Sequence, residues 1–499
     1  MRFGSFFPVL IIVLGFAFAS GPANASDFID DYLSGSIIKF DMSQDEVTDT
    51  KKFEAEMDLR FRYGTLSGFV RASNDRPFTY QTDSFEIQKR GLNYQLNDDW
   101  DVSIGDYSLV FGRGLALNAV EDRPVDRDAQ LDGAMVKGDV GFGDLTLFWG
   151  RHGSDNPEFF VSGVNTTTDD PDDTVYGGRL AFDVGDVDLG ASYVNTDLTR
   201  WGEPLFSTVI TEADIGFPID QVDVYYESAW FTRDEPENVE ESLDGRGQFA
   251  DVIYADNGFS VRGAWIRYDR AHFDYALPPT LKRFNIENNA AFADDETGFS
   301  LDLNYSPPSW NGHSSQFVYA KTNGIIDKGR EFENFFLEWE SPSTKDWIGS
   351  LSYDQVDGFL QFYGALYGTD TSYRGTLDGP FPGGGTFHLS ARYRTLRTEF
   401  EDDDEVELGL DWNVTPDFTV GLFRETSTRP TEPPPPGLFG IPTESPGEWN
   451  SAFVKWAADP WNEFELRLGS ERGGFQCSGG TCAQLPPFKG IRFTYYHYM

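Results

Sequence analysis

The chain has 499 residues, of which 39 are Lys or Arg and 82 are Asp or Glu, giving a formal net charge of -43. A phosphate backbone would repel so acidic a chain, which argues against a nucleic-acid partner. Its 44 Phe, 22 Tyr and 12 Trp carry too much apolar surface for a disordered coil.

The first 25 residues have the features of a secretory signal peptide. Arg2 supplies a positive charge, residues 9–19 form an apolar stretch, and Ala23-Asn24-Ala25 is a small-x-small cleavage site. The apolar stretch is shorter than the roughly 20 residues that a membrane-spanning helix needs. We therefore expect 1–25 to be removed on export and 26–50 to form either a short periplasmic segment or a first strand.

The chain beyond residue 50 alternates between apolar and polar side chains with a period of two, which is the spacing of β-strands. From Phe53 to Phe61 every second residue is apolar, and charged residues occupy the positions between them. The same alternation occurs in five further segments, which are 100–104, 187–193, 299–305, 405–412 and 464–468. A helical spacing is nowhere comparably sustained.

Two kinds of connection separate these segments. Tight turns rich in Gly, Asp and Pro are expected at 63–64, 97–99, 141–143, 185–186, 256–258 and 415–417. Longer polar connections are expected at 154–173, 232–245, 269–296, 368–384 and 426–447. Short turns on one side and long loops on the other are typical of a transmembrane β-barrel. The sequence thus predicts an all-β fold, an antiparallel barrel of about 22 strands over residues 51–499, with short periplasmic turns and long extracellular loops.

A soluble β-helix, sandwich array or propeller is the alternative fold. Tryptophans near strand ends favour the membrane barrel because they suit interfacial belts; they are Trp100, Trp149, Trp339, Trp412 and Trp456. The charged strand faces would need desolvation in a soluble core, whereas a wet lumen avoids that cost. We expect the protein in the bacterial outer membrane, with lipid, lipopolysaccharide and the barrel-assembly machinery as its partners.

The segment 111–130 holds the most informative group of charges. Three arginines, Arg113, Arg123 and Arg127, lie close in sequence to Glu121 and Asp122. Facing basic and acidic side chains are what a constriction loop inside a barrel would need. We therefore expect 111–130 to fold into or over the lumen, with an ion-paired surface loop as the alternative.

No catalytic residue or cofactor is predicted. The chain lacks Gly-x-Ser-x-Gly, so it has no nucleophile elbow, and it lacks Cys-x-x-Cys-His, so it binds no c-type haem itself. Acidic clusters at 169–173, 294–296 and 402–405 contain oxygen ligands for Ca²⁺ but lack the spacing of a defined calcium loop. Solvated loop tips are the simpler interpretation, and we predict no metal site.

The two cysteines, Cys477 and Cys482, are separated by Ser-Gly-Gly-Thr, which suits a hairpin loop. In an exported protein this spacing predicts a disulfide that closes the last loop. The final segment, 489–499, alternates Ile491, Phe493 and Tyr495 with polar residues, as an amphipathic closing strand would. It ends in Met499 and not in the Phe or Trp more usual for outer-membrane barrels.

Two parts of the sequence resemble a known family. The segment from Ser103 to Leu117, followed by Gln130-Leu131-Asp132-Gly133, is similar to the N-terminal portion of an uncharacterised outer-membrane β-barrel family of Gram-negative bacteria. The segments 472–482 and 487–490 are similar to the last hairpin of that family. The resemblance implies a porin-like barrel and no established substrate.

The sequence therefore predicts a non-enzymatic outer-membrane barrel that acts as a passive channel for small solutes or ions. One alternative is a scaffold that sheathes a separate multihaem cytochrome for electron transfer across the membrane. Another is an adhesin or receptor that works through its surface loops.

Overall fold

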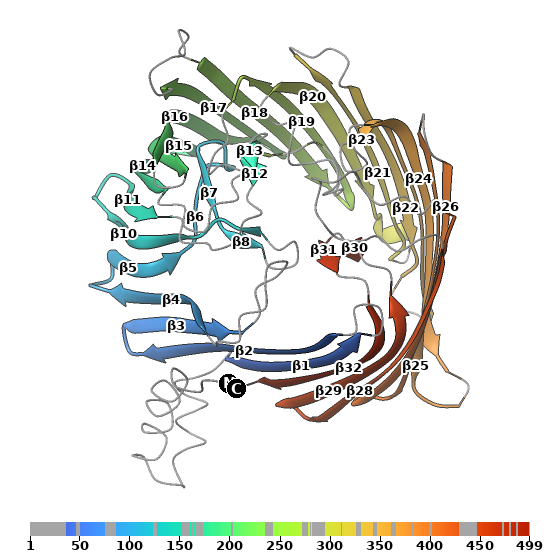
Figure 1. Ribbon diagram of the computed structural model, residues 1–499. Helices are drawn as coiled ribbons and strands as arrows, with labels where there is room; N and C mark the ends of the chain where they lie inside the picture. The colour runs from blue at the N-terminus through green and yellow to red at the C-terminus, as the bar shows by residue number, and fades with distance from the viewer. Residues whose placement is uncertain are drawn as a thin grey trace, which may run out of the picture.

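A computed structural model gives the structure of the protein and describes residues 36–45, 50–74, 86–122, 127–151, 160–161, 164–165, 173–200, 203–234, 243–271, 278–279, 281, 295–310, 312–325, 331–342, 347–360, 366–381, 383–398, 402–428, 447–471, 474–478, 481–485 and 488–498. Twenty-four of its strands form one antiparallel sheet that closes on itself (Figure 1). The closing pair is β1 (Ile37–Asp45) with β32 (Phe488–Tyr498). The predicted all-β barrel is therefore confirmed, with 24 strands in place of about 22.

The remaining barrel strands follow one another in chain order. They are β2 (Thr50–Tyr63), β3 (Leu66–Ser73), β4 (Glu86–Gln95), β5 (Trp100–Tyr107), β10 (Leu131–Asp139), β11 (Asp144–Arg151), β14 (Thr174–Val184), β15 (Val187–Arg200), β16 (Glu203–Ile219), β17 (Val222–Asp234), β18 (Leu243–Asp256), β19 (Phe259–Asp269), β20 (Asp295–Tyr305), β21 (Ser314–Gly324), β22 (Glu331–Glu340), β23 (Ile348–Leu360), β24 (Leu366–Pro380), β25 (Thr386–Thr398), β26 (Asp402–Thr415), β27 (Phe418–Ser427), β28 (Gly447–Asp459) and β29 (Asn462–Glu471). Every segment predicted to alternate as a strand lies within one of the barrel strands, apart from the last residue of 489–499, which lies outside the described residues.

Small elements accompany the barrel. Four two-stranded sheets pair β6 (Leu109–Phe111) with β7 (Leu117–Ala119), β8 (Glu121–Asp122) with β9 (Arg127–Asp128), β12 (Phe160–Val161) with β13 (Val164–Asn165), and β30 (Gly474–Ser478) with β31 (Thr481–Leu485). A 3₁₀ turn, η3, covers Pro308–Trp310. In the described part of the chain no helix is long and apolar enough to cross a membrane.

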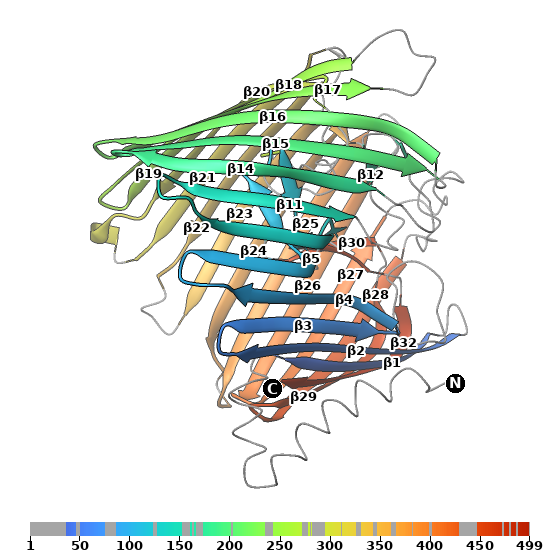
Figure 2. The ribbon, with the colours of Figure 1, turned by 90° about the vertical axis from the view of Figure 1, so that its left-hand side faces the viewer.

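The two ends of the barrel differ in their connections, and Figure 2 shows tight turns such as the one between β2 and β3 at one end. All six predicted tight turns join neighbouring strands at one end, here called the turn end. The predicted connections 154–173, 232–245, 269–296 and 426–447 all join strands at the opposite end, the loop end. The predicted long connection at 368–384 is wrong, because most of it belongs to β24, which pairs with β23 and β25 along its length.

Gly385 shows why the connection after β24 is short. Its backbone has φ +79°, a conformation that costs glycine little, and Phe381 N donates to Gly385 O at 3.0 Å. A Cβ at Gly385 would stand 2.0 Å from the carbonyl oxygen of Asn413. The turn therefore depends on a residue without a side chain, and it returns the chain directly into β25.

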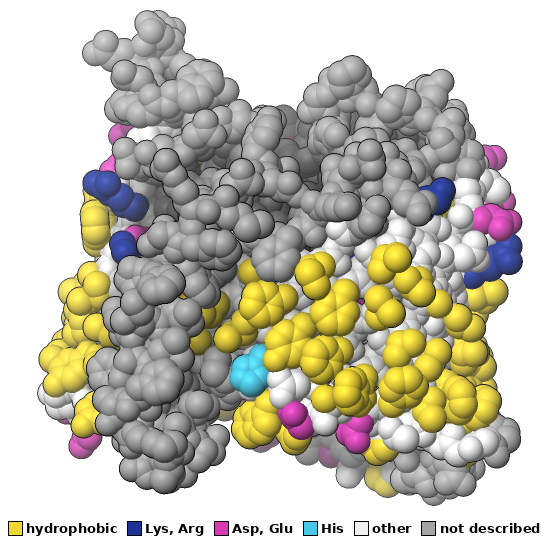
Figure 3. All heavy atoms as spheres, turned by 60° about the horizontal axis from the view of Figure 1, so that its bottom comes forward, with side chains coloured by type: hydrophobic (Ala, Val, Ile, Leu, Met, Phe, Trp, Pro, Cys, Tyr) yellow, Lys and Arg dark blue, Asp and Glu magenta, His cyan; other side chains and the backbone are white. Residues whose placement is uncertain are grey.

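The outer face of the barrel is apolar. Alternate residues of the strands place large hydrophobic side chains on this face, including Ile104 (57% exposed), Leu351 (63%) and Leu422 (53%). Figure 3 shows such side chains gathered in a band, with acidic and basic side chains at its borders. This is the surface that a transmembrane barrel presents to lipid.

Tryptophans lie towards both ends of this band. Trp149, Trp230 and Trp265 lie in the loop-end halves of their strands, and all are at least one-third exposed. Of the five tryptophans predicted to form a belt, the other four are at the turn end, namely Trp100, Trp339, Trp412 and Trp456. Two levels of tryptophan fit the two interfaces of a bilayer.

An aromatic ladder crosses the seam where the barrel closes. Trp456 on β28 stacks on Phe464 on β29 at 5.6 Å between ring centroids, and Phe464 stacks on Tyr495 on β32 at 4.9 Å. Tyr495 also stacks on Phe40 of β1 at 6.2 Å and donates a hydrogen bond to Asn462 Oδ1 at 2.7 Å. Direct register pairs align these rings, so the ladder joins the first strand to the last three.

The sequence predicts a signal peptide at one end of the chain and a closing strand at the other. Residues 1–25, predicted as a signal peptide, lie outside the described residues, as does Met499. Of the segment 26–50, residues 37–45 form β1 and residue 50 begins β2. His497 lies in β32, with Nδ1 at 2.9 Å from Asn462 Oδ1.

Candidate functional site

Residues 108–122 and 127–130, the described part of the segment 108–130, leave the barrel wall and lie inside it. Figure 1 shows β6, β7 and β8 within the ring of strands. Tyr107 and Leu131, which flank the segment, are direct register partners in β5 and β10. The wall therefore continues without interruption across the point where the inserted segment, 108–130, departs from it.

Apolar packing holds the first half of the inserted segment. Phe111, Leu115 and Leu117 are at most 1% exposed. They belong to one buried cluster with side chains of the wall strands β11 and β15–β19, which include Phe148, Val194, Ile210, Phe231, Phe249 and Ile266. The rings of Phe111 and Phe148 meet edge to face at 5.6 Å. This sector of the wall thus carries apolar side chains on both faces, one towards lipid and one towards the inserted segment.

A buried carboxylate holds the turn between β6 and β7. Glu227 on β17 has no exposed surface, and its two oxygens accept hydrogen bonds from Arg113 N at 2.8 Å and Leu115 N at 3.2 Å. The hydroxyl of Tyr225 donates to the same carboxylate at 3.0 Å. Within the turn, Gly114 N donates to Phe111 O at 2.8 Å. Backbone groups that would otherwise be buried without partners are thereby satisfied.

A second carboxylate group lies beside Glu227. Arg179 on β14 is 3.3 Å from Glu212 and 2.7 Å from Asp214, and both acids come from β16. The guanidinium of Arg113 lies over the ring of Tyr225 at 5.0 Å. Arg113 is exposed, whereas the carboxylates beneath it are covered. The inserted segment therefore presents a cation to the lumen above an acidic wall.

The second half of the segment is tied to a different sector of the wall. Glu121 on β8 forms an ion pair with Arg71 on β3 and lies 3.9 Å from Lys89 on β4. Lys89 Nζ also donates to Gln130, whose Nε2 donates to Ser108 at 2.8 Å. Because its two halves contact different groups of strands, the segment is fixed at two places on the wall.

The predicted constriction residues can now be located. Arg113 and Glu121 lie inside the barrel on the inserted segment. Asp122 and Arg127 are register partners in β8 and β9, but their side chains lie outside the described residues, as does Arg123 altogether. Glu227 and Arg71, which bond to the inserted segment from the wall, were not predicted, nor was Arg179, which pairs with Glu212 and Asp214 beside Glu227. Their only sequence signal is a charge at an inward position of a strand.

We expect Gly112→Ala to loosen the inserted segment. Gly112 has φ +54°, and a Cβ there would stand 2.5 Å from Glu212 Oε1 and 2.6 Å from Glu227 Oε1. Positive φ costs a non-glycine residue about 1 kcal/mol, and the contact adds to that cost. The measurement is tryptic cleavage after Arg113 in the purified barrel. Gly141→Ala is the control, since Gly141 has φ +89° with nothing within 4 Å. Equal protease resistance of the two variants would contradict the docking described here.

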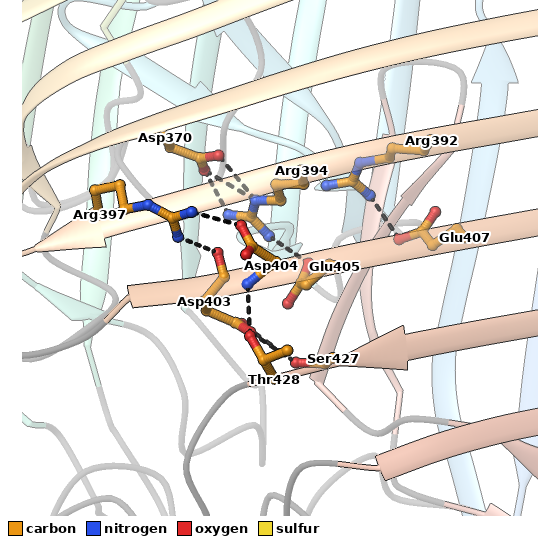
Figure 4. A network of polar contacts seen from close by, with 10 residues as sticks. All are labelled: Asp370, Arg392, Arg394, Arg397, Asp403, Asp404, Glu405, Glu407, Ser427 and Thr428. Carbon is orange, nitrogen blue, oxygen red and sulfur yellow. Dashed lines mark hydrogen bonds and ion pairs between the residues drawn. The ribbon is translucent and has the colours of Figure 1, made fainter.

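A further polar network covers the inner wall on β24–β27 (Figure 4). Arg392 and Arg394 alternate with Tyr393, which is 41% exposed on the outer face, so both arginines point inwards. Arg394 bonds to Asp370 at 2.9 and 3.1 Å and lies 3.5 Å from Glu405, while Arg392 bonds to Glu407 at 2.9 Å. These pairs lie almost entirely between adjacent strands, where they cross-link the wall.

The acidic cluster 402–405 divides between the two faces of the sheet: Asp403 and Glu405 point inwards, and Asp404 lies on the outer face with Tyr393. Asp403 accepts hydrogen bonds from Ser427 and Thr428, and Asp404 pairs with Arg397 at 2.6 Å. Each of these contacts engages a protein donor. Among the described residues no group of three or more His, Cys, Asp or Glu side chains is arranged to hold a metal ion.

Cys477 and Cys482 are direct register partners in the β30–β31 hairpin. Figure 1 draws this hairpin within the ring of strands. The side chains of both cysteines lie outside the described residues. The disulfide between them therefore stays a prediction.

Comparison with known proteins gives one family match. The model of a family described as "Family of unknown function (DUF6029)" matches residues 48–317, which is more than half of the chain. No curated protein matches the chain.

Several solved barrels are similar to the chain at low sequence identity. The siderophore receptor PirA from Pseudomonas aeruginosa is 9% identical with a TM-score of 0.47, covering 94% of this chain and 81% of the receptor. OccK10 (OpdN) from P. aeruginosa is 13% identical with a TM-score of 0.42, covering 80% and 99%. A chain of the E. coli P pilus assembly intermediate PapC-PapD-PapK-PapG is 9% identical with a TM-score of 0.49, covering 94% and 61%. All these scores are below 0.5, so no function is transferred from them.

Proposed function

We propose that this chain, which belongs to the family of unknown function DUF6029, is a passive channel for small solutes or ions across the bacterial outer membrane. Three features support the proposal. The barrel is closed by β1 and β32, its outer face is apolar, and its inner wall carries charged side chains. An apolar exterior around a polar interior suits a water-filled passage through lipid.

The observation that carries the proposal is the docking of the inserted segment on the inner wall. A segment fixed at two places inside a barrel reduces the cross-section available to solutes. Arg113 and Glu121 then contribute opposite charges to the narrowed region, as the facing rows of a constriction would.

Removing the inserted segment should raise single-channel conductance in planar bilayers, because the passage would widen. The geometry allows a clean deletion. Tyr107 and Leu131 are register partners, so residues 109–129 can be replaced by a short Gly-Ser linker without shifting β5 against β10. Heat-modifiable gel mobility would show that the shortened chain still forms a closed barrel.

The matched control replaces the turn at 140–143, between β10 and β11 at the turn end, with the same linker. That variant should conduct like the original barrel. Unchanged conductance after removal of 109–129 would overturn the constriction. Absence of conductance from the intact purified barrel would overturn the channel and favour the scaffold that sheathes a multihaem cytochrome.

The same architecture leads us to propose the protein's surroundings. The apolar band fits outer-membrane lipid, and the charged side chains at its borders fit lipid headgroups and lipopolysaccharide. Export through the predicted signal peptide and insertion by the barrel-assembly machinery belong to this proposal.

A further inference from the structure

We propose that the lumen selects cations over anions, an inference that rests on the proposed channel function and names its substrate class. Positive and negative side chains are combined on the inner wall in a way that supports this inference. The net charge of the whole chain would not by itself support cation selection, because part of the 82 acidic residues lies in loops and outer rims.

Four covered arginines on the wall each pair with two or more carboxylates. Their side chains are between 11% and 30% exposed. The four groups are Arg71 with Asp58 and Glu121, Arg179 with Glu212 and Asp214, Arg394 with Asp370 and Glu405, and Arg467 with Glu465 and Glu471. The groups of Arg394 and Arg467 each carry one negative charge in excess, whereas Lys89 and Arg60 also lie against the carboxylates of the Arg71 group.

The arginines in these groups are poorly placed to attract an anion. In the pair of Arg394 with Asp370, Nε donates to both carboxylate oxygens, at 2.9 and 3.1 Å, and Nη1 donates to Glu405 at 3.5 Å. Arg179 likewise directs Nη1 and Nη2 at the acids of β16, and Nη1 also at Ser192. A guanidinium whose donors are engaged by carboxylates offers little to a passing chloride or organic acid.

The four groups are spread around the barrel. They lie on β2–β3 with β8, on β14 with β16, on β24–β26 and on β29. A cation crossing the lumen therefore meets carboxylates from several directions, with excess negative charge on β24–β26 and on β29. A potential of one thermal energy unit raises the local concentration of monovalent cations about threefold and lowers that of anions by the same factor.

Carboxylates facing open space add to this field. Glu338 alternates with Leu337 and Trp339, which are 47% and 39% exposed on the outer face, so Glu338 points inwards. Glu338 and Glu340 line a hollow of about 610 Å³ at the turn end, beside Gln316 and Asn304. Here carboxylates face a space large enough for hydrated ions.

The test is the K⁺ to Cl⁻ permeability ratio, obtained from the reversal potential of the purified full-length barrel in a tenfold KCl gradient. We expect the ratio to exceed one by about threefold or more. Neutralising one acid in each group, with Glu121→Gln, Asp214→Asn, Glu405→Gln and Glu465→Gln, should bring the ratio towards one. If that variant fails to fold, Glu338→Gln with Glu340→Gln should lower the ratio by a smaller factor.

Glu333→Gln is the control, because Glu333 lies on the outer face and pairs there with Tyr319 and Lys321. It should leave the ratio unchanged. Steady conductance with a ratio of one or below would overturn cation selection while leaving the channel intact. A complete lack of conductance would overturn both.

Discussion

Replacing Glu227 with Ala should release the inserted segment and raise the conductance of the barrel. The change removes the acceptor for Arg113 N, Leu115 N and the Tyr225 hydroxyl, all within a covered site. A buried donor left without an acceptor costs about 1–3 kcal/mol. Loss of the acceptors of the two backbone donors alone would shift the equilibrium from the docked towards the released segment by roughly 30-fold or more. Single-channel recording, with tryptic cleavage after Arg113, measures the effect.

Glu227→Gln is the matched variant. Its amide oxygen can still accept a hydrogen bond from the turn, but its amide nitrogen leaves one backbone N–H without an acceptor, so this variant should release the segment less than Glu227→Ala does. Both variants should keep heat-modifiable mobility, because the Glu227 side chain takes no part in the strand pairing of the wall. If Glu227→Ala behaved like the original barrel in both assays, the carboxylate would not be what holds the turn.

Replacing Tyr495 with Ala should lower the thermal stability of the barrel, because it weakens the seam where β32 closes on β1. Tyr495 stacks on Phe464 and Phe40 and donates to Asn462. Each aromatic pair contributes about 0.5–1.5 kcal/mol beyond its buried area. The hydrogen bond contributes about 1 kcal/mol more. The measurement is the temperature at which the folded band on a gel converts to the unfolded one.

Ile491→Ala is the control for this prediction, because Ile491 lies on the same face of β32 and is 54% exposed to lipid. Lipid chains can replace much of the contact that Ile491 loses, so its conversion temperature should fall less. Equal shifts for the two variants would show that the ladder across the seam adds nothing to closure.

The strands were predictable because lipid and water face opposite sides of one sheet. A segment such as 53–61 alternates visibly, since every second residue meets the apolar band. The segment 368–384 was misread because it is rich in Gly, Thr and Asp, which usually indicate turns. In β24 the polar residues Asp370 and Arg374 occupy inward positions, and pairing with two neighbouring strands overrides their weak β propensity.

The inserted segment was predictable and its anchors were not. Arg113 and Glu121 lie close together in a charged stretch, and a reader of the sequence can group them. Glu227 lies 114 residues beyond Arg113 in an ordinary strand. The contact between these two positions depends on the curvature of the barrel, because that curvature determines which wall strand faces β6 and β7. A single sequence does not contain that curvature in any local pattern.

The distance in sequence between the inserted segment and its anchor has a consequence for the order of assembly. Phe111, Leu115 and Leu117 find their apolar partners on β15–β19, and Glu227 lies on β17. Until β17, β18 and β19 have joined the growing sheet, these side chains have only part of their apolar surface to pack against. Contacts this remote form slowly, because the chain entropy of closing the intervening loop is lost first. An assembling barrel would therefore pass through a stage in which the β6–β7 hairpin exposes its apolar side chains. The lumen would acquire its final shape only after the wall around β17 was in place.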